Sequence, residues 1–389
     1  MNMITGAVVE YRDDELTDKW LVENWFLIDK NLDQYTMAYT FDYLIRRQKL
    51  ISEGWLTDSK GRGFVILTTT GCNASCPYCY EKGCSVKNMD EKTARDVVEY
   101  IDKYGKRDVD ITWFGGEPLV NQKVINIITE GLKERNISFT SRITTNGYFL
   151  QNIDVYTLKY KWNVYSLQIT IDSEGEEYEK IKGFEPGTYE KMLQTMKRLA
   201  EGGIKVRVRF NVTPYNAAGI HKAIDDIADL KIDPDMIGIY TAPVADESMK
   251  ETDQELETKF QNLLDLDEHM EEVDMLEYKQ LRDFSIHPFS CMADRWDCLV
   301  ISPDGLISCC EHMIDGGIGD IWNGITHPEL FDEWKIKREP QDICKDCKCM
   351  TMCMKLKNCK GYVPCNVYEK NWWEQRVVMF LRRLCEKED

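Results

Sequence analysis

Short runs of β-branched and aromatic residues alternate with amphipathic stretches between residues 63 and 243. The amphipathic stretches predict helices, for example at Glu91–Tyr104 and Thr188–Glu201. Alternation of strand and helix predicts an α/β fold with a parallel sheet, and six such units would form an open or closed barrel with its chemistry at the carboxyl ends of the strands. The expected strands are Phe64–Thr69, Val109–Phe114, Phe139–Thr144, Val164–Ile171, Lys205–Val212 and Met236–Tyr240.

The regions on either side of this pattern have a different composition. The first 60 residues carry Trp20 and Trp25 among charged residues and predict a small, mostly helical segment. An acidic helical stretch, Asp253 to Leu281, precedes a C-terminal region that holds eleven of the 15 cysteines. We therefore expect three parts, namely residues 1–60, residues 61–285 and residues 286–389.

Charge and hydropathy narrow the classes of partner. The 389 residues include 67 acidic and 49 basic side chains, which give a net charge of −18. Such a chain repels phosphate backbones and anionic lipid, so we expect neither nucleic acid nor membrane as a partner. No run of 18 apolar residues and no secretory signal are visible. We expect a cytoplasmic protein, in which clustered cysteines more often bind metals than form disulfides.

Three cysteines follow the first expected strand directly, in the spacing Cys72-x3-Cys76-x2-Cys79. Three thiolates on one short loop can hold three corners of a [4Fe–4S] cluster and leave the fourth iron open to a small molecule. A zinc ion would need a fourth ligand, and structural zinc sites usually pair two Cys-x2-Cys turns. Buried or zinc-binding cysteines are the alternative interpretation of this loop.

With an aromatic residue, Tyr78, before the third cysteine, this loop resembles the signature of the radical S-adenosylmethionine (radical SAM) superfamily. The resemblance implies that S-adenosylmethionine binds the open iron and is cleaved reductively to a 5′-deoxyadenosyl radical, which abstracts hydrogen from a substrate. It also implies an electron donor such as flavodoxin or ferredoxin. The implied fold is a partial (β/α)6 barrel.

Further family motifs match at the ends of the next three expected strands. The resemblance implies that these positions contact the cofactor, and an ordinary strand-to-helix turn is the alternative for each. Lys182 stands where relatives often have an arginine. The matching positions are Gly115, Gly116 and Glu117 after the second strand, Thr145 and Asn146 after the third, and Thr170 and Asp172 at the end of the fourth.

The C-terminal cysteines resemble the SPASM extension of radical SAM enzymes that modify peptides and proteins, and a zinc ribbon is the alternative for four of them. The resemblance implies two auxiliary [4Fe–4S] clusters, hence three in all, with electron transfer as their role. The spacing departs from the family pattern after Cys353, so Cys309 or Cys349 could replace a neighbour. The implied ligands are Cys291, Cys298, Cys310 and Cys359 for the first cluster and Cys344, Cys347, Cys353 and Cys365 for the second. Cys84 and Cys385 fit neither set.

The expected substrate is a peptide or protein. In sulfatase-maturing relatives an aspartate follows the third cysteine of the first auxiliary set, and here that residue is Glu311. Glu311 or the following His312 is a candidate proton acceptor, and a solvated charge beside a cluster is the alternative. The first interpretation is installation of a thioether or carbon–carbon crosslink in a ribosomally made precursor peptide. The alternatives are formylglycine generation in a sulfatase and a non-catalytic iron–sulfur or zinc scaffold. His221 and His269 show no pairing in the sequence and are expected to be structural.

Overall fold

The computed structural model describes residues 18–23, 61–79, 81–244, 251–277, 292–294, 298–313, 317–330, 341–344, 347, 349 and 365–386. The chain divides into two compact units. The first, called the barrel unit below, consists of Ser59–Glu277 and Arg295–Phe331. The second, called the terminal unit, consists of Met1–Asp58, Tyr278–Asp294 and Asp332–Asp389. The expected three-part division at residues 60 and 285 stays a prediction.

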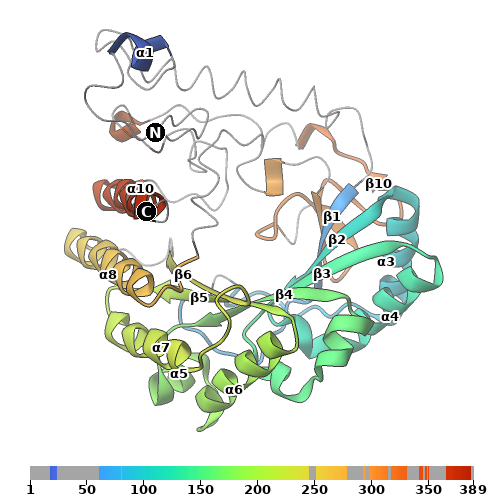
Figure 1. The fold of residues 1–389 in the computed structure, drawn as a ribbon. Coiled ribbons are helices and arrows are strands. Elements are labelled where there is room, and N and C mark those ends of the chain that lie inside the picture. The colour runs from blue at the N-terminus through green and yellow to red at the C-terminus, as the bar shows by residue number, and fades with distance from the viewer. Residues whose placement is uncertain are drawn as a thin grey trace. The chain divides into compact units, whose positions relative to one another are not determined.

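Six parallel strands form the centre of the barrel unit, and their order in the sheet follows the chain (Figure 1). The sheet stays open, because β1 pairs with β2 on one side and with a later strand, β7, on the other. The expected α/β class and its six strands are therefore confirmed, with strand ends that differ by up to four residues from those expected. The strands are β1 (Gly61–Thr69), β2 (Gly105–Gly115), β3 (Ser138–Thr145), β4 (Val164–Ile171), β5 (Lys205–Val212) and β6 (Ile237–Pro243).

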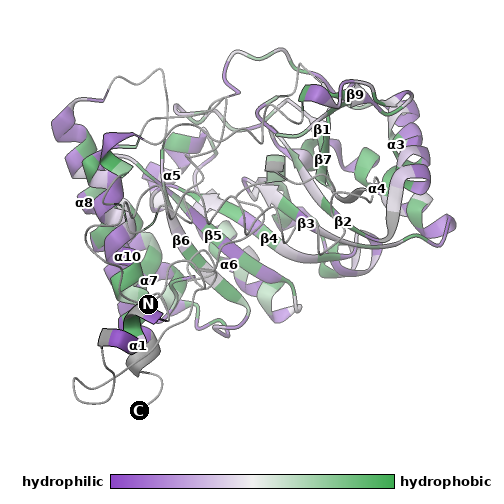
Figure 2. Ribbon diagram, turned by 90° about the horizontal axis from the view of Figure 1, so that it is seen from above, coloured by the Kyte–Doolittle hydropathy of each residue, from purple (hydrophilic) through white to green (hydrophobic). Residues whose placement is uncertain are grey.

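Helices connect these strands and bury one side against the sheet. In α3 the side chains of Val97, Val98 and Ile101 are buried, while charged residues occupy the other face (Figure 2). The carboxylate of Asp90 accepts from the Thr93 amide and so begins this helix. The helices are α3 (Glu91–Tyr104), α4 (Gln122–Glu134), α5 (Gly175–Lys182), α6 (Thr188–Glu201), α7 (Ala217–Asp229) and α8 (Asp253–Glu272), with the single turns η1 (Pro118–Asn121), η2 (Tyr148–Asn152) and η3 (Thr157–Lys161).

The acidic helix α8 is shorter than the stretch Asp253–Leu281 expected from the sequence. It begins with a capping box, in which Thr252 and Glu255 each bond to the other's backbone amide. It ends at Glu272, and Asp274 takes a positive φ of 54°. Leu276 then forms a parallel bridge to Ile239 of β6. The helix therefore ends, and the chain joins the edge of the sheet, within the stretch Asp253–Leu281 whose composition favours helix throughout.

A short antiparallel extension continues the sheet beyond β1. Strand β7 (Cys298–Ile301) pairs in parallel with Gly63–Ile66, and β8 (Leu306–Ser308) turns back beside it. Strands β9 (Gly319–Asp320) and β10 (Gly324–Ile325) complete the order. Part of the cysteine-rich C-terminal region thus belongs to the same sheet as the barrel strands.

The described part of the terminal unit is largely helical. It contains α1 (Asp18–Glu23), α10 (Val367–Glu386) and the single turns η5 (Met292–Asp294) and η6 (Asp342–Cys344). In α10 the guanidinium of Arg376 lies 5.0 Å from the ring centre of the buried Trp372. Across the described ranges, no helix combines the length and the apolar character that crossing a bilayer requires.

Candidate active site

The loop after β1 is fixed at its base by hydrogen bonds to residues 85–88. The Thr70 amide donates to the Lys87 carbonyl at 2.9 Å, and the Thr70 hydroxyl donates to the Ser85 carbonyl at 2.9 Å. The Thr69 hydroxyl donates to the Asn88 side chain at 2.6 Å. Thr69 and Thr70 are both buried. The three expected cysteine ligands therefore extend from a rigid support.

The thiols of Cys72, Cys76 and Cys79 lie on this loop, with Cys72 exposed and the other two half-buried. The Ala74 amide donates to the Cys72 sulfur at 3.3 Å, and the Asn146 side chain donates to it at 3.6 Å. Burial raises the pKa of the Cys72 and Cys79 thiols, so each favours its protonated form when no metal is bound. The loop thus presents soft sulfur donors together with an amide that can stabilise a thiolate.

Within the described ranges, no three thiol, imidazole or carboxylate groups converge closely enough to hold one metal ion. The cluster at Cys72, Cys76 and Cys79 is therefore argued from the spacing of these cysteines in the sequence and from their position directly after β1.

Gly115 and Gly116 bring the end of β2 into close contact with the cysteine loop. A Cβ atom on Gly115, whose φ is +132°, would lie 2.1 Å from the Thr69 carbonyl oxygen. A Cβ atom on Gly116 would lie 2.6 Å from the Gly71 carbonyl oxygen. Side chains at both positions are therefore excluded by backbone atoms. The contact with the backbone of the cysteine loop is by itself a sufficient reason for glycine at both positions, whether or not a ligand binds there.

The carboxylate of Glu117 is fully buried and already bonded to protein donors. It accepts from the Asn146 amide at 2.7 Å, the Leu119 amide at 3.0 Å and the Thr145 hydroxyl at 2.8 Å. Burial raises the pKa of Glu117 to about 7, although these hydrogen bonds oppose the rise. Glu117 thus joins the end of β2 to the end of β3. A direct contact between Glu117 and a cofactor stays a prediction.

One group of polar side chains contacts the cysteine loop and contains Tyr78, Asp172 and Lys182. The Lys182 ammonium lies 2.5 Å from the Asp172 carboxylate and donates to the Tyr78 hydroxyl at 3.4 Å. Asn211 also donates to the Tyr78 hydroxyl, at 3.3 Å. Burial raises the pKa of Tyr78 far above its usual range. The structure therefore brings together three residues expected near the cofactor, and it adds Asn211, which sequence reasoning missed.

The alternation of apolar and polar residues along β5 could have identified Asn211 from the sequence. In the strand Lys205–Val212 every second side chain is buried among the helices, and Arg207, Arg209 and Asn211 are only partly buried on the other face. Register pairs Arg209 with Thr170 of β4, which is also partly buried. Thr170 therefore stands on the inner face of the sheet, where the sequence places a cofactor contact.

Cys298, Cys309, Cys310 and Glu311 belong to the β7–β8 hairpin or follow it directly. The antiparallel register pairs Val300 with Ser308. Strand β8 ends at Ser308, and Cys309 and Cys310 follow it in a bend. Oε2 of Glu311 is buried and has no hydrogen-bond partner among the described residues. The choice of Cys310 rather than Cys309 as a ligand stays a prediction.

Four cysteines of the second set are described in the terminal unit. Cys344, Cys347 and Cys365 are half-buried and Cys349 is buried. A hydrogen bond from Cys349 lowers the pKa of Cys347 to about 7. The structure thus places Cys349 beside an expected ligand. The predicted ligands Cys291, Cys353 and Cys359 lie outside the described residues, and all auxiliary-cluster assignments stay predictions.

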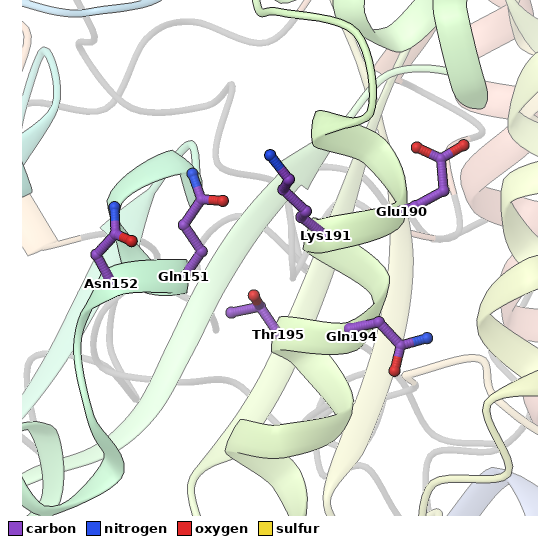
Figure 3. A pocket seen from close by; sticks show the side chains of 6 residues that line it. All are labelled: Gln151, Asn152, Glu190, Lys191, Gln194 and Thr195. Atoms are coloured by element: carbon purple, nitrogen blue, oxygen red, sulfur yellow. The ribbon is translucent and has the colours of Figure 1, made fainter.

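Two other polar features lie away from the cysteine loop. An open pocket of about 390 Å³ lies between η2 and α6 (Figure 3), and it is lined by Gln151, Asn152, Glu190, Lys191, Gln194 and Thr195. The rings of His221 and His269, expected to be unpaired, are 5.0 Å apart across α7 and α8. His269 also lies 2.8 Å from the Asp225 carboxylate. Neither feature contains a thiol or adjoins the loop of Cys72–Cys79.

Sequence comparison identifies the parallel-sheet part of the chain. The fold is an α/β domain in which the cysteine loop directly follows the first strand of a parallel sheet. Residues 66–227 match the radical SAM superfamily. The chain therefore contains a radical SAM domain over these residues.

Curated relatives match over parts of their length. A probable GTP 3′,8-cyclase of Methanosarcina mazei is 31% identical over 162 residues, which are 38% of this chain and 46% of that protein. The sporulation killing factor maturation protein SkfB of Bacillus subtilis is 27% identical over 166 residues, 41% of this chain and 38% of that protein. The chain thus spans less than half of the length of either relative.

Solved structures share the fold over a larger share of the chain. Native anSMEcpe with bound AdoMet and the Cp18Cys peptide has a TM-score of 0.61 and 16% identity, and the match covers 83% of this chain and 98% of that one. Streptococcus suis SuiB bound to precursor peptide SuiA has a TM-score of 0.55 and 16% identity, covering 86% and 81%. At this level of identity the likeness establishes the fold.

Radical SAM enzymes use S-adenosylmethionine and a [4Fe–4S] cluster, and the residues of the loop fit that pair. Cys72, Cys76 and Cys79 supply three sulfur donors, and exposed Cys72 leaves one side of the loop accessible. Asn146 donates to both the Cys72 sulfur and, at 2.9 Å, the Asn73 side chain, so it orients the first ligand. When bound, the pair supplies a radical that abstracts hydrogen. The residues of the chain hold and orient the cluster and S-adenosylmethionine.

Proposed function

We propose that this protein is a radical SAM/SPASM enzyme that abstracts hydrogen from a residue of a ribosomally made precursor peptide and installs a thioether or carbon–carbon crosslink. Forming either bond removes two hydrogens from the peptide. One leaves as a hydrogen atom to the 5′-deoxyadenosyl radical, and the other leaves as a proton and an electron. Glu311 is the proposed proton acceptor, and the proposed auxiliary clusters accept the electron.

The observation that carries the proposal is the position of Cys298, an expected auxiliary-cluster ligand, on strand β7 beside β1. Cys298 pairs in register with Gly63, on the strand that leads into the Cys72–Cys79 loop. The six-residue step from Gly63 to Thr69 spans about 20 Å at the rise of a strand. The sheet thus supports both the Cys72–Cys79 loop and Cys298. The likeness to SkfB and to SuiB with its precursor peptide favours a peptide as the substrate.

Sulfatase maturation is the second candidate, because an acidic residue follows Cys310 and a relative of this kind matches. The serine-type anaerobic sulfatase-maturating enzyme of Bacteroides thetaiotaomicron is 28% identical over 172 residues. Both reactions remove two hydrogens from the substrate, but only formylglycine generation leaves an aldehyde. A hydrazide probe on the product separates them, since it labels the aldehyde and not a crosslink.

Iron content and product mass test the proposal together. We expect about twelve irons per chain after anaerobic reconstitution and about eight in the Cys72/Cys76/Cys79→Ala variant, because each cubane holds four. The variant should also lose cleavage of S-adenosylmethionine. With a short precursor peptide from the same genomic neighbourhood, the wild type should release 5′-deoxyadenosine and a product two hydrogens lighter. About four irons with bound zinc would overturn the auxiliary clusters, and hydrazide labelling would favour the sulfatase reaction.

The variant Glu311→Gln tests the proton acceptor. We expect unchanged iron content and unchanged cleavage of S-adenosylmethionine, with at least tenfold less crosslinked product. Glu329→Gln is the matched control, because Glu329 is an exposed carboxylate of the same unit that bonds to His327. Equal product from the two variants would remove Glu311 from the reaction.

A further inference from the structure

Lys182 contacts the cysteine loop through both its side chain and its backbone. We propose that the buried Lys182–Asp172 ion pair positions this loop and that the ammonium of Lys182 faces the loop. The positive charge of the ammonium makes a cluster bound to the loop easier to reduce. The inference rests on the proposed cluster at Cys72, Cys76 and Cys79. It assigns Lys182 a role that differs from the cofactor contact implied by the family resemblance.

The ion pair is enclosed by protein. The side chain of Lys182 is 2% exposed and that of Asp172 is not exposed at all, with 2.5 Å between Nζ and Oδ2. The side chain of Asn216 donates to the Asp172 carbonyl at 2.8 Å and helps to fix this end of β4. An ammonium held in this way is directed into the protein, so its contacts are internal ones.

Lys182 reaches the loop at two points that lie between Cys72 and Cys79. Its Nζ donates to the Tyr78 hydroxyl at 3.4 Å, and its carbonyl accepts from the Ser75 amide at 2.8 Å. The next residue, Gly183, ends α5 with a φ of +72°, and a Cβ atom there would lie 2.4 Å from the Ser75 hydroxyl. The end of α5 is therefore fitted against the loop, with no space for a side chain at residue 183.

Lys182 is the positive member of the pair, and its Nζ reaches the loop at the hydroxyl of Tyr78, the residue directly before Cys79. A cluster held by three thiolates becomes more negative when it is reduced, so a nearby positive charge favours the reduced form.

A redox titration of the substrate-free, reconstituted full-length protein tests the inference without measuring turnover. The electron paramagnetic resonance signal of the loop cluster is obtained by subtracting the spectrum of the Cys72/Cys76/Cys79→Ala variant. We expect a lower midpoint potential and less iron per chain for Lys182→Met, a higher midpoint potential for Asp172→Asn, and a value near wild type for Lys182→Arg. Lys180→Met is the matched control, because Lys180 lies on the same helix with its side chain 76% exposed.

Opposite shifts for the two members of the pair separate an electrostatic effect from general damage. Shifts of the same sign, or a Lys182→Met potential equal to that of Lys180→Met, would overturn the inference while leaving the proposed function intact. If Lys182→Met assembles no cluster, Asp172→Asn and Lys182→Arg decide by the same criterion. A wild type whose loop binds no iron would overturn the proposed function and this inference together.

Discussion

The carboxylate of Glu117 accepts a hydrogen bond from the backbone amide of Asn146 at 2.7 Å, and this bond joins the ends of β2 and β3. The same Asn146 donates through its side chain to the Cys72 sulfur. One buried acid is thus connected to an expected cluster ligand through a single intervening residue. The arrangement makes Glu117 part of the support of the cysteine loop, and it makes the protonation state of Glu117 important for stability.

We expect Glu117→Gln to change how stability depends on pH. Burial raises the pKa of Glu117 to about 7, so the folded protein retains a proton that the unfolded chain releases above its ordinary pKa of 4.5. Stability therefore falls as pH rises from about 4.5 to about 7, by roughly 3 kcal/mol in total. Glutamine does not titrate and removes this contribution. Thermal unfolding of metal-free protein at pH 5 and pH 7.5 measures the slope, and an identical slope in the variant would contradict the assignment.

Gly116→Ala should displace the cysteine loop. The new methyl group would lie 2.6 Å from the Gly71 carbonyl oxygen and 2.7 Å from that of Thr70. Overpacking of this kind costs about 1–3 kcal/mol. Gly238→Ala is the control, because its nearest neighbour would be the Glu277 side chain at 3.3 Å. The thermal midpoint and the iron content should both fall for residue 116 and stay near wild type for residue 238. Equal behaviour of the two variants would refute the close contact.

The ligand set that the family resemblance implies predicts different outcomes for two adjacent cysteines. That set includes Cys310 and not Cys309. We expect Cys310→Ala to lose about four irons per chain, the content of one cubane, and Cys309→Ala to retain them. Iron analysis after identical reconstitution gives the answer. Loss of iron from the Cys309 variant alone would reverse the assignment.

Cys349→Ala should make Cys347 less reactive in the metal-free protein. The hydrogen bond from Cys349 is the main cause that lowers the pKa of Cys347 to about 7. Without it the pKa should rise toward the usual 9.0, which leaves little thiolate at neutral pH. Alkylation at pH 7 should slow by at least about tenfold, because the thiolate is the reacting form. Peptide mass spectrometry measures the rate, and Cys365→Ala, expected to leave it unchanged, is the control.

Local patterns in the sequence sufficed for most elements of the barrel unit. The alternation in Val164–Ile171 and Lys205–Val212 gave both strands their observed ends, because one face of each is buried. The helix Glu91–Tyr104 was also predicted with its observed ends, between the capping Asp90 and Gly105. These elements follow from burial and capping, which act over a few residues.

Other features depend on contacts between distant residues. The four-residue strand β7 joins β1 through a pairing that spans more than 230 positions, and no local pattern in the sequence indicates this pairing. The end of α8 at Glu272 is set by the bridge from Leu276 to Ile239, without a glycine or proline to mark it. The inward direction of Lys182 depends on Asp172, a residue of another element. The family motif identified the right position, and tertiary charge pairing determined where the side chain points.

The pairing of β7 with β1 has a consequence for synthesis of the protein. Strand β1, which leads into the cysteine loop, gains its second neighbour only when residues 298–301 arrive, more than 230 positions after β1 itself. Until then one edge of β1 has unsatisfied backbone groups, and exposed strand edges promote association between chains. The nascent chain is therefore most vulnerable to aggregation during the long interval between the synthesis of β1 and that of β7, so chaperone supply should limit the yield of folded protein.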